Sequence, residues 1–428
     1  MAVFETLRTG SRGPLTELLQ LGLTRAGYTP GSIDGIFGSR TYNAVLRFQR
    51  NSGLAADGIV GGRTWNALTP WLTGYTTHTV RRGDTFYRLS QTYNTTISAL
   101  ETANPAVDPL SLRIGETLTV PLSFDVVPTN ISFTSTVMEL AVQGLRARYP
   151  FLVTGSAGKS VSGKPLYYIK IGQGERQVFY NGAHHANEWI TAPLLMKFLE
   201  KYAYAYSRGG EIFNTVAEEL YNTASLYLIP LVNPDGVDLV TGQTVSGSRY
   251  DSAKAIAGAY PAIPFPSGWK ANIMGTDLNL QYPAGWEQAK AIKFAQGYTS
   301  PAPRDYVGSA PLSAVESRAV YDFTRTHDFR LTISYHTQGE VIYWKYADYQ
   351  PENSLEIARQ FASVSGYAVE TTPTESGYAG YKDWYIMTYN RPGYTIEVGR
   401  GENPLPIADF DRIYEDNLGI LVLGLIVS

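Results

Sequence analysis

The sequence predicts a multidomain protein: a small helical domain, a second small domain of the β-α-α-β type, and an α/β domain in which a mixed sheet lies between helices. Three observations support this prediction. The chain has 428 residues, and at roughly 150 residues per domain this length suggests about three domains. A short motif near the N-terminus recurs 23 residues further on, and beyond residue 125 short β-rich runs alternate with long amphipathic stretches. Such alternation is typical of an α/β fold.

Composition limits what the protein can bind. The 35 Lys and Arg residues nearly balance the 38 Asp and Glu residues, which leaves a formal net charge of −3. We therefore expect no nucleic acid partner, because no basic field is available to hold phosphates. The chain has no Cys, which excludes disulfides, thiol nucleophiles and Cys-ligated metals. Any metal ion must be held by His and carboxylate side chains.

Neither end of the chain predicts an export or membrane segment. The opening residues lack the positive region and apolar core that mark a secretory signal, so we expect no Sec-type export. The longest apolar run, residues 418–427, is about half of the ~20 residues needed to span a bilayer. We expect this run to form a final helix packed on a core, and we expect no membrane partner.

Residues 1–72 are predicted to form the helical domain. Asp34-Gly-Ile-Phe-Gly-Ser-Arg-Thr recurs as Asp57-Gly-Ile-Val-Gly-Gly-Arg-Thr. Each copy combines an Asp-Gly turn, a further Gly, a Thr that can cap a helix, and apolar residues at helical spacing. An apolar stripe at residues 15–23 predicts a helix before the first copy. Residues 9–69 closely resemble the peptidoglycan-binding domain of the three-helix type, whose pattern DGIFGxxTxxAVxxFQ is present here with its spacing intact.

Residues 75–122 are predicted to form the second small domain. Alternation predicts a strand, Gly83-Asp84 a turn, and Thr85 the N-cap of a helix. A second helix, 97–103, is followed by a returning strand. Residues 76–121 resemble a LysM domain, with the family's V-x-x-G-D-T, A-N-P and G-x-x-L-x-V-P signatures. The resemblance implies binding of glycans that contain N-acetylglucosamine.

An alternative interpretation treats both modules as spacers, because residues such as Gly35, Gly38 and Gly83 serve the backbone rather than a ligand. Two wall-glycan signatures in tandem make a chance match improbable, however. Linked weak sites also gain avidity through effective concentration. We therefore expect the glycan strands of peptidoglycan to be a partner of this part of the chain.

From residue 125 to residue 428 the pattern predicts the α/β domain. Two long amphipathic stretches, 192–206 and 312–326, predict helices. Short β-rich runs predict strands at residues 166–171, 177–180, 225–232, 331–335, 341–344 and 394–398. A sheet layered between helices carries its site at the ends of strands.

A candidate metal site follows the second of these strands. Two of the five His residues stand in Gly182-Ala-His-His-Ala-Asn-Glu188, where His185 and Glu188 have the spacing that lets both side chains reach one divalent ion. The third ligand must come from elsewhere, and His336, at the C-terminal end of a predicted strand, is best placed. Two His, one Glu and water form a catalytic zinc set. Without further context, such a pair is more often an ordinary surface or core pair.

The context of this pair resembles a known family. Along the chain it is followed by Asn233-Pro-Asp-Gly, Gly275-Thr-Asp-Leu-Asn, Tyr335-His-Thr-Gln-Gly-Glu and Tyr394-Thr-Ile-Glu-Val-Gly. Residues 125–428 thereby resemble the zinc carboxypeptidase family of the carboxypeptidase A type. The resemblance implies one zinc ion per chain, held by His185, Glu188 and His336, with Glu397 as the catalytic general base.

Departures from the family pattern bear on the substrate. The family's exopeptidases use the Asn and Arg of D-x-N-R-N to clamp a terminal carboxylate, whereas this chain keeps Asn279 but has Leu280 in place of the Arg. Leu cannot replace a bidentate Arg–carboxylate pair, so selection for a free α-carboxylate should be weakened. Lys270 matches the family's position for the catalytic cation that polarises the carbonyl or oxyanion.

Three further residues are candidates for substrate binding, as is Asn279. His184 either orients a metal ligand or contacts substrate, or it simply hydrogen-bonds within its loop. Arg400 either reaches a substrate carboxylate or forms an ion pair with an acid such as Glu402. Tyr378, or else Tyr381, is the candidate for the family's mobile tyrosine, since this loop is built differently here.

The combined resemblance predicts a zinc metallopeptidase that hydrolyses the γ-D-glutamyl–L-diamino-acid bond, to diaminopimelate or Lys, in the stem peptides of peptidoglycan. Proteins with this architecture are similar to the γ-D-glutamyl-L-diamino-acid endopeptidases of spore-forming bacteria. We therefore expect a cytoplasmic, sporangial or spore-associated protein that acts on the cell wall in sporulation. Two alternatives stay open: a zinc exo-carboxypeptidase acting on peptides or muropeptides, and a non-catalytic wall-binding protein.

Overall fold

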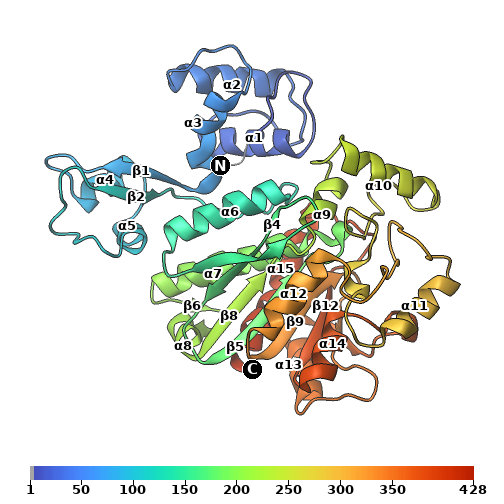
Figure 1. Cartoon of the computed structure of the whole chain (residues 1–428). Coiled ribbons are helices and arrows are strands. Elements are labelled where there is room, and N and C mark those ends of the chain that lie inside the picture. The colour runs from blue at the N-terminus through green and yellow to red at the C-terminus, as the bar shows by residue number, and fades with distance from the viewer. Residues whose placement is uncertain (1–3) are drawn as a thin grey trace. The chain divides into compact units, whose positions relative to one another are not determined.

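The computed structural model describes residues 4–428, and the chain divides into two compact units (Figure 1). The first contains the residues up to 132 together with 136–153, and the second contains residues 133–135 and 154–428. The three predicted domains divide the chain more finely than these units, and their boundaries stay a prediction.

The first unit begins with three helices, as the repeat predicts. They are α1 (Pro14–Arg25), α2 (Ser39–Asn51) and α3 (Gly62–Thr73). The apolar stripe of α1 is buried at Leu18, Leu19 and Leu23, so the helix places its hydrophobic face in a core.

Two buried glutamines fasten the repeated Asp-Gly turns. Gln20 Nε2 donates to the Asp carboxylate of the first turn at 2.9 Å, and Gln49 Nε2 donates to that of the second at 3.1 Å. Each amide also bonds the Ile carbonyl and the Thr hydroxyl of its turn. Thr41 and Thr64 therefore lie inside α2 and α3 as partners of the glutamines. The expectation that they cap these helices is wrong, because glycines occupy both N-cap positions.

The β-α-α-β segment of the first unit also has the predicted order. Its two strands pair antiparallel, with Tyr75 opposite Pro121. Thr85 caps the first helix, because its hydroxyl accepts a hydrogen bond from the Arg88 backbone N–H at 3.1 Å. The elements are β1 (Tyr75–Thr79), α4 (Phe86–Thr92), α5 (Ile97–Ala103) and β2 (Thr117–Pro121), and α6 (Ser135–Arg148) follows.

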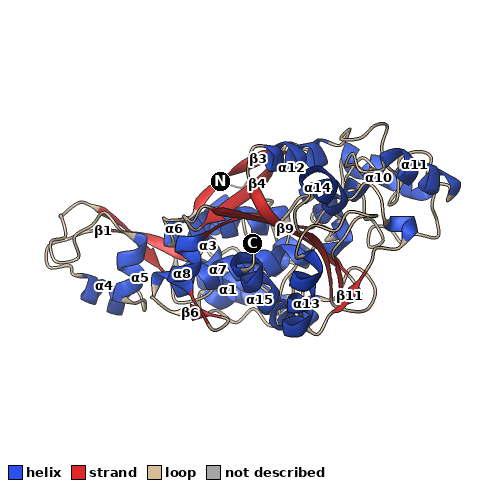
Figure 2. Cartoon of the chain, turned by 90° about the horizontal axis from the view of Figure 1, so that it is seen from below, coloured by secondary structure: helices blue, strands red, loops and turns tan. Residues whose placement is uncertain are grey.

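The second unit is built on an eight-stranded mixed sheet, which confirms the predicted α/β fold (Figure 2). Its strands are β3 (Val153–Lys159), β4 (Pro165–Ile171), β5 (Arg176–Gly182), β8 (Ala224–Ile229), β9 (Phe329–Thr337), β10 (Val341–Tyr343), β11 (Ala368–Glu370) and β12 (Gly393–Val398). The strand order is β11-β10-β12-β9-β5-β8-β4-β3. Strands β8, β5, β9 and β12 run parallel, whereas β4 pairs antiparallel with β8 and β10 pairs antiparallel with β12. A separate two-stranded sheet pairs β6 (Glu211–Ile212) with β7 (Thr215–Val216).

Helices cover both faces of this sheet because successive side chains on a strand point to opposite faces. On β5, Phe179 packs against Phe323 of α12 (Val315–Arg325) and Tyr381 of α14 (Tyr381–Tyr389). The next residue, Tyr180, instead donates from its hydroxyl to the Leu421 carbonyl of α15 (Phe410–Ile426) at 3.0 Å. Figure 2 shows α12 and α14 on one side of the strands and α15 on the other. The remaining helices are α7 (Thr191–Ser207), α8 (Ala217–Thr223), α9 (Pro234–Val240), α10 (Ser248–Gly258), α11 (Trp286–Ala295) and α13 (Ser354–Ser365).

The carboxyl ends of the parallel strands bring the motif residues to one edge of the sheet. Strand β5 ends directly before the segment that carries His185 and Glu188, and β9 contains His336 close to its end. On the neighbouring strand β12, Glu397 stands in register with His336. In α/β sheets this edge is where ligands bind.

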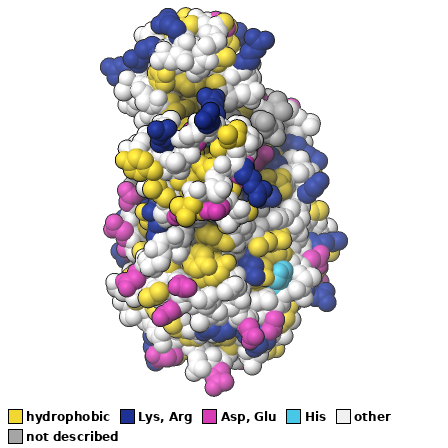
Figure 3. Space-filling model, turned by 90° about the vertical axis from the view of Figure 1, so that its left-hand side faces the viewer, with side chains coloured by type: hydrophobic (Ala, Val, Ile, Leu, Met, Phe, Trp, Pro, Cys, Tyr) yellow, Lys and Arg dark blue, Asp and Glu magenta, His cyan; other side chains and the backbone are white. Residues whose placement is uncertain are grey.

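The protein surface carries charges of both signs. On the face shown in Figure 3 no continuous basic field is present, in keeping with the near-neutral composition. Within residues 4–428, no helix combines the length and the apolar character needed to cross a bilayer.

Candidate active site

The segment after β5 is fixed by hydrogen bonds at both ends. The Ala183 backbone N–H donates to the Thr191 hydroxyl at 2.8 Å, and that hydroxyl donates to the Glu188 carbonyl at 2.9 Å. The Ala186 N–H donates to the Lys270 carbonyl at 3.0 Å. A short 3-10 turn over Ala186–Glu188 then turns the Glu188 side chain back toward His185.

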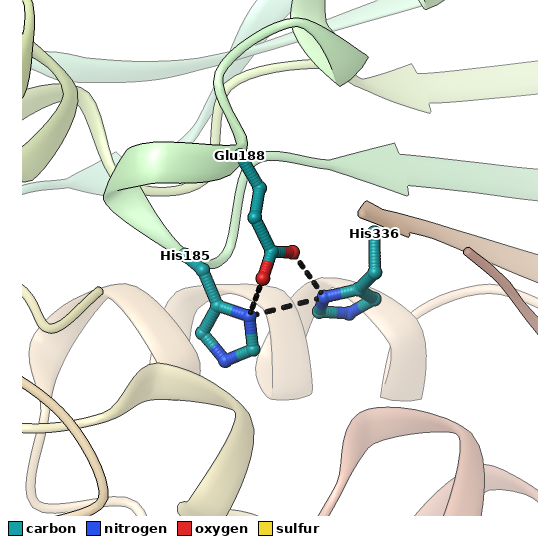
Figure 4. A group of neighbouring side chains, drawn as sticks. All are labelled: His185, Glu188 and His336. Carbon is teal, nitrogen blue, oxygen red and sulfur yellow. Dashed lines mark hydrogen bonds and ion pairs between the residues drawn. The ribbon is translucent and has the colours of Figure 1, made fainter. Parts of the chain in front are cut away.

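Three buried side chains converge at this point (Figure 4). His185 Nδ1 lies 2.9 Å from one Glu188 oxygen, and His336 Nδ1 lies 2.9 Å from the other. The two Nδ1 atoms are 3.2 Å apart. Among residues 4–428, no other His, Cys, Asp or Glu residues form a group of three or more with this geometry.

The chemistry of these donors fits a zinc ion. His185 Nε2 lies 3.1 Å from Asp277 Oδ1, which can only accept a proton, so a neutral ring that donates there would turn its Nδ1 lone pair toward the Glu188 carboxylate. A cation must lie between Nδ1 and the carboxylate: burial opposes a charged ring, but Glu188 and Asp277 raise the pKa of His185 to about 9, so a proton fills this place until a metal ion replaces it. Two imidazoles and one carboxylate are a donor set that zinc takes in catalytic sites.

Asp277 is a functional residue that the sequence analysis did not single out, although it stands in the quoted motif Gly275-Thr-Asp-Leu-Asn. Its carboxylate also accepts hydrogen bonds from the backbone N–H groups of Asn279 (3.1 Å) and Asp305 (3.2 Å). Burial would raise the pKa of Asp277, but the charge and hydrogen bond of His185, the charge of Lys270 and the Asp305 N–H hold it well below its usual value. Since metal-ligating His residues generally donate their second N–H to a carboxylate or carbonyl, the need for such a partner could have pointed to this Asp.

Glu397 and Lys270 lie beside the three donors. Burial and the nearby charge of Glu188 raise the pKa of Glu397 to about 8. A cation bound by the three donors opposes this shift. Lys270 Nζ lies 3.2 Å from Glu188 Oε1. Burial opposes the charged form of Lys270, but Glu188 and Asp277 keep its pKa above the usual value. The site therefore holds one buried carboxyl group, whose pKa responds to the charge bound beside it, and one fixed positive charge.

A cavity of about 700 Å³ opens over this cluster. Its wall contains several charged groups besides the residues already described, and two tyrosines, 298 and 343, that the sequence analysis did not name. The lining residues used in the argument are His185, Glu188, Lys270, Asp277, Asn279, Leu280, Lys293, Arg304, Asp305, His336, Lys382, Asp383 and Glu397.

The structure brings only one of the four candidate substrate-binding residues into this cavity, namely Asn279. His184 is fully buried beneath it, with Nε2 3.0 Å from the Tyr282 hydroxyl. Tyr378 packs in an apolar cluster with Leu280 and Trp286. The alternative, Tyr381, is fully buried in the core.

Arg400 is exposed and pairs with Glu340 through Nε at 2.6 Å, and it does not line the cavity. This is the ion-pair alternative that the sequence left open, with Glu340 as the partner instead of Glu402. Leu280, by contrast, lies in the cavity wall, where the sequence analysis expects the family's Arg.

Comparisons with known proteins agree with this geometry. Residues 138–419 match the model of the zinc carboxypeptidase family, residues 12–68 that of a peptidoglycan binding domain, and residues 78–121 that of the LysM domain. The chain is 43% identical to gamma-D-glutamyl-L-diamino acid endopeptidase 1 of Lysinibacillus sphaericus over 66% of this chain and 70% of that protein. It is 27% identical to carboxypeptidase B of Bos taurus over 66% of this chain and 67% of that protein.

A solved structure shares the fold. Carboxypeptidase A from Helicoverpa armigera superposes with a TM-score of 0.52 at 19% identity, covering 80% of each chain. At that identity the likeness concerns the fold alone. The family match, in contrast, spans about two thirds of the sequence and includes all the residues of the metal cluster. The chain therefore belongs to the zinc carboxypeptidase family and is a zinc metallopeptidase.

Proposed function

We propose that this chain hydrolyses the γ-D-glutamyl–L-diamino-acid bond in peptidoglycan stem peptides, with one zinc ion held by His185, Glu188 and His336. The observation that carries the proposal is the convergence of these three donors beside Glu397, on the floor of a cavity large enough for a short peptide. The residue released from D-Glu is diaminopimelate or Lys.

Each side chain has a role that follows from its position. When bound, zinc supplies a Lewis acid that polarises the scissile carbonyl and activates water. Glu397 takes the proton of the attacking water and delivers it to the leaving amine. Lys270 holds its positive charge where negative charge develops on the carbonyl oxygen. Asp277 fixes the tautomer and orientation of His185.

Three facts favour a wall peptide as the substrate. The relative with 43% identity is named an endopeptidase for this bond. The two N-terminal segments match wall-binding families, and linked weak sites raise the local concentration of enzyme on an insoluble wall. Leu280 leaves the cavity wall without the usual carboxylate clamp, which favours cleavage inside a stem peptide over removal of a terminal residue. We place the activity at the cell wall, where glycan strands and stem peptides are the partners, and in a spore-forming cell this includes the wall of the sporangium.

The test is mass spectrometry of defined muropeptides before and after digestion. The wild-type protein should release diaminopimelate-containing or Lys-containing fragments only when zinc is present. The Glu397→Gln variant should bind zinc and wall as the wild type does but release no fragment. Turnover by this variant near the wild-type rate would exclude Glu397 as the base.

The retention of Asn279 in the cavity keeps an exopeptidase as a second candidate. An exopeptidase needs a free carboxylate at the C-terminus of its substrate, whereas the proposed endopeptidase does not. Amidation of the C-terminal carboxylate of the muropeptide should therefore leave cleavage intact. Loss of cleavage on amidation would favour the exopeptidase.

A further inference from the structure

Four basic residues line the cavity, and they differ in how far their charge is already paired. Lys270 lies 3.2 Å from Glu188, and Lys293 lies 2.7 Å from Asp305. Lys382 donates to Asp383 at 2.6 Å and to the Lys345 carbonyl at 2.7 Å. The fourth is Arg304. Its guanidinium has five N–H donors and can therefore bind two partners at once.

Only one nitrogen of the Arg304 guanidinium is occupied. Its Nε donates to Asp305 Oδ2 at 2.6 Å, and within residues 4–428 neither Nη atom has a hydrogen-bond partner. The side chain is 44% exposed, so it reaches the open part of the cavity. Asp305 also pairs with Lys293, so one carboxylate lies between two cations. The three side chains of Lys293, Arg304 and Asp305 together therefore carry a net positive charge.

The backbone around Arg304 is tied to the residues that position the metal donors. The preceding carbonyl, of Pro303, accepts hydrogen bonds from the Lys270 N–H (2.8 Å) and the Ala271 N–H (2.9 Å). The following residue, Asp305, donates from its N–H to Asp277 at 3.2 Å. Asp305 has a φ of 65°, a left-handed conformation that a residue with a side chain adopts at a cost and that such bonds can hold in place. The backbone of Arg304 is thus held at a fixed position relative to Lys270 and Asp277.

The chemistry of the proposed substrate calls for a cation at such a position. In a γ-D-glutamyl bond the scissile carbonyl belongs to the side chain of D-Glu, so the α-carboxylate of that residue stays free a few bonds away. An ordinary α-peptide has no anion there. Leu280 cannot pair with this carboxylate, and the three lysines of the cavity already have anionic partners. The paired Nη atoms of an Arg match the two oxygens of a carboxylate.

We infer that Arg304 binds the α-carboxylate of the γ-D-glutamyl residue through its two Nη atoms and thereby selects γ-linked over α-linked substrates. This inference rests on the proposed function and adds a specificity-determining residue to it. The residue acts on binding and orientation of the substrate and takes no part in proton transfer.

Two synthetic peptides test the inference: L-Ala-γ-D-Glu-diaminopimelate with its D-Glu α-carboxylate free, and the same peptide with that group amidated. The wild-type enzyme should have the higher kcat/KM for the acid. The Arg304→Gln variant should lose at least about tenfold in kcat/KM on the acid, since a hydrogen bond to a charged group is lost, with little change on the amide. The kcat/KM of Arg304→Lys on the acid should lie between those of the wild type and Arg304→Gln, because Lys keeps the positive charge but lacks the paired Nη donors of Arg.

Binding of the product L-Ala-D-Glu, measured by calorimetry, gives a readout that does not depend on turnover. Binding should weaken in Arg304→Gln by a similar factor. The matched control is Arg359→Gln, because Arg359 is an exposed arginine of α13 that lies outside the cavity; it should behave as the wild type. Circular dichroism melting checks that each variant is folded. If Arg304→Gln does not fold, the comparison of acid and amide peptides is made with Arg304→Lys instead.

The outcomes separate the inference from the function on which it rests. If the wild type cleaves the acid and Arg304→Gln keeps the same preference for acid over amide, the inference is wrong and the proposed function stands. An equal loss on both peptides also overturns it, because that is the effect of a merely structural residue. If the wild type cleaves neither peptide, the proposed function fails and the inference falls with it.

Discussion

At the scale of single residues, Asp277 decides how the metal donors are oriented. Its carboxylate accepts the Nε2 proton of His185 and is itself held by two backbone N–H groups. His185 Nδ1 is therefore directed at the position between Glu188 and His336 by the fold itself. Pre-orientation of this kind raises metal affinity, because less order must be imposed on binding.

Replacing Asp277 by Asn should weaken zinc binding by about 10- to 100-fold, the usual effect of losing such a partner. The neutral amide oxygen of Asn is a weaker acceptor for the His185 N–H than a carboxylate. It also lacks the negative charge that makes His185 a better metal ligand. Competition with a chromophoric chelator measures the affinity. The exposed Asp251 of α10 provides the control, since Asp251→Asn should bind zinc as the wild type does. Unchanged affinity in Asp277→Asn would contradict this role.

The residues of the metal cluster could be predicted from the sequence, whereas most of the predicted substrate-binding residues do not line the cavity. His185 and Glu188 share one short turn, so their spacing alone limits where their side chains can go. Arg400 is close to Glu397 along the chain, but it lies beyond the end of β12 and pairs with Glu340. Arg304 lies in a loop that is held by backbone hydrogen bonds to residues distant in the sequence. No local sequence pattern predicts such hydrogen bonds.

At the scale of elements, the turn between β1 and α4 shows how a signature residue stabilises a small fold. Asp84 Oδ2 accepts a hydrogen bond from the Arg81 N–H at 2.7 Å and lies 2.7 Å from His78 Nε2. The hydrogen bonds to His78 and Arg81 lower the pKa of Asp84 below its usual value. The carboxylate thus joins the strand to the turn that starts the helix.

This pKa shift predicts a pH dependence. Because the folded state binds the Asp84 proton less readily than the unfolded state, the stabilisation is present above the ordinary Asp pKa and is lost as the pH falls through the lower folded value. Asp84→Asn should therefore reduce hydrogen-exchange protection of the β1 and β2 amides at pH 7. The difference from the wild type should shrink under strongly acidic conditions. An equal difference at both pH values would show that the charge is not responsible.

Elements with a strong local pattern were predicted, and those at the edges of the sheet were not. The predicted helix at 97–103 matches α5, and the predicted final helix, 418–427, coincides with the C-terminal part of α15 except for residue 427. Strand β3 was missed because Val153–Lys159 is a half-exposed edge strand of small and polar residues without alternation. Strand β11, of three residues, forms the other edge. Pairing with a neighbour, rather than their own sequence, makes these segments strands.

At the scale of the whole molecule, wall recognition and chemistry lie in different units. The segments that match wall-binding families belong to the first unit, whereas all three metal donors belong to the second. The first unit contributes no donor to the metal cluster. Attachment and hydrolysis should therefore be separable without cutting the chain.

Removal of zinc with a strong chelator should abolish hydrolysis of soluble muropeptides while the protein still sediments with purified sacculi. This result is expected because the donors are buried in the second unit, and no other group of potential metal ligands is found among residues 4–428. Adding zinc back should restore hydrolysis. Release from sacculi on chelation, or hydrolysis that survives it, would each contradict this separation.

The register between β9 and β12 has a consequence for engineering. Glu397 and His336 are neighbours across one ladder of main-chain bonds, so the ladder sets their separation whatever the surrounding side chains are. The segments around residue 298 and residues 372–376 also face the cavity, but they lie outside both strands and supply no metal donor. A library that randomises these segments, and leaves untouched both strands and residues 303–305, whose backbone bonds hold Lys270 and Asp277, should yield enzymes with new peptide preferences and an unaltered catalytic step.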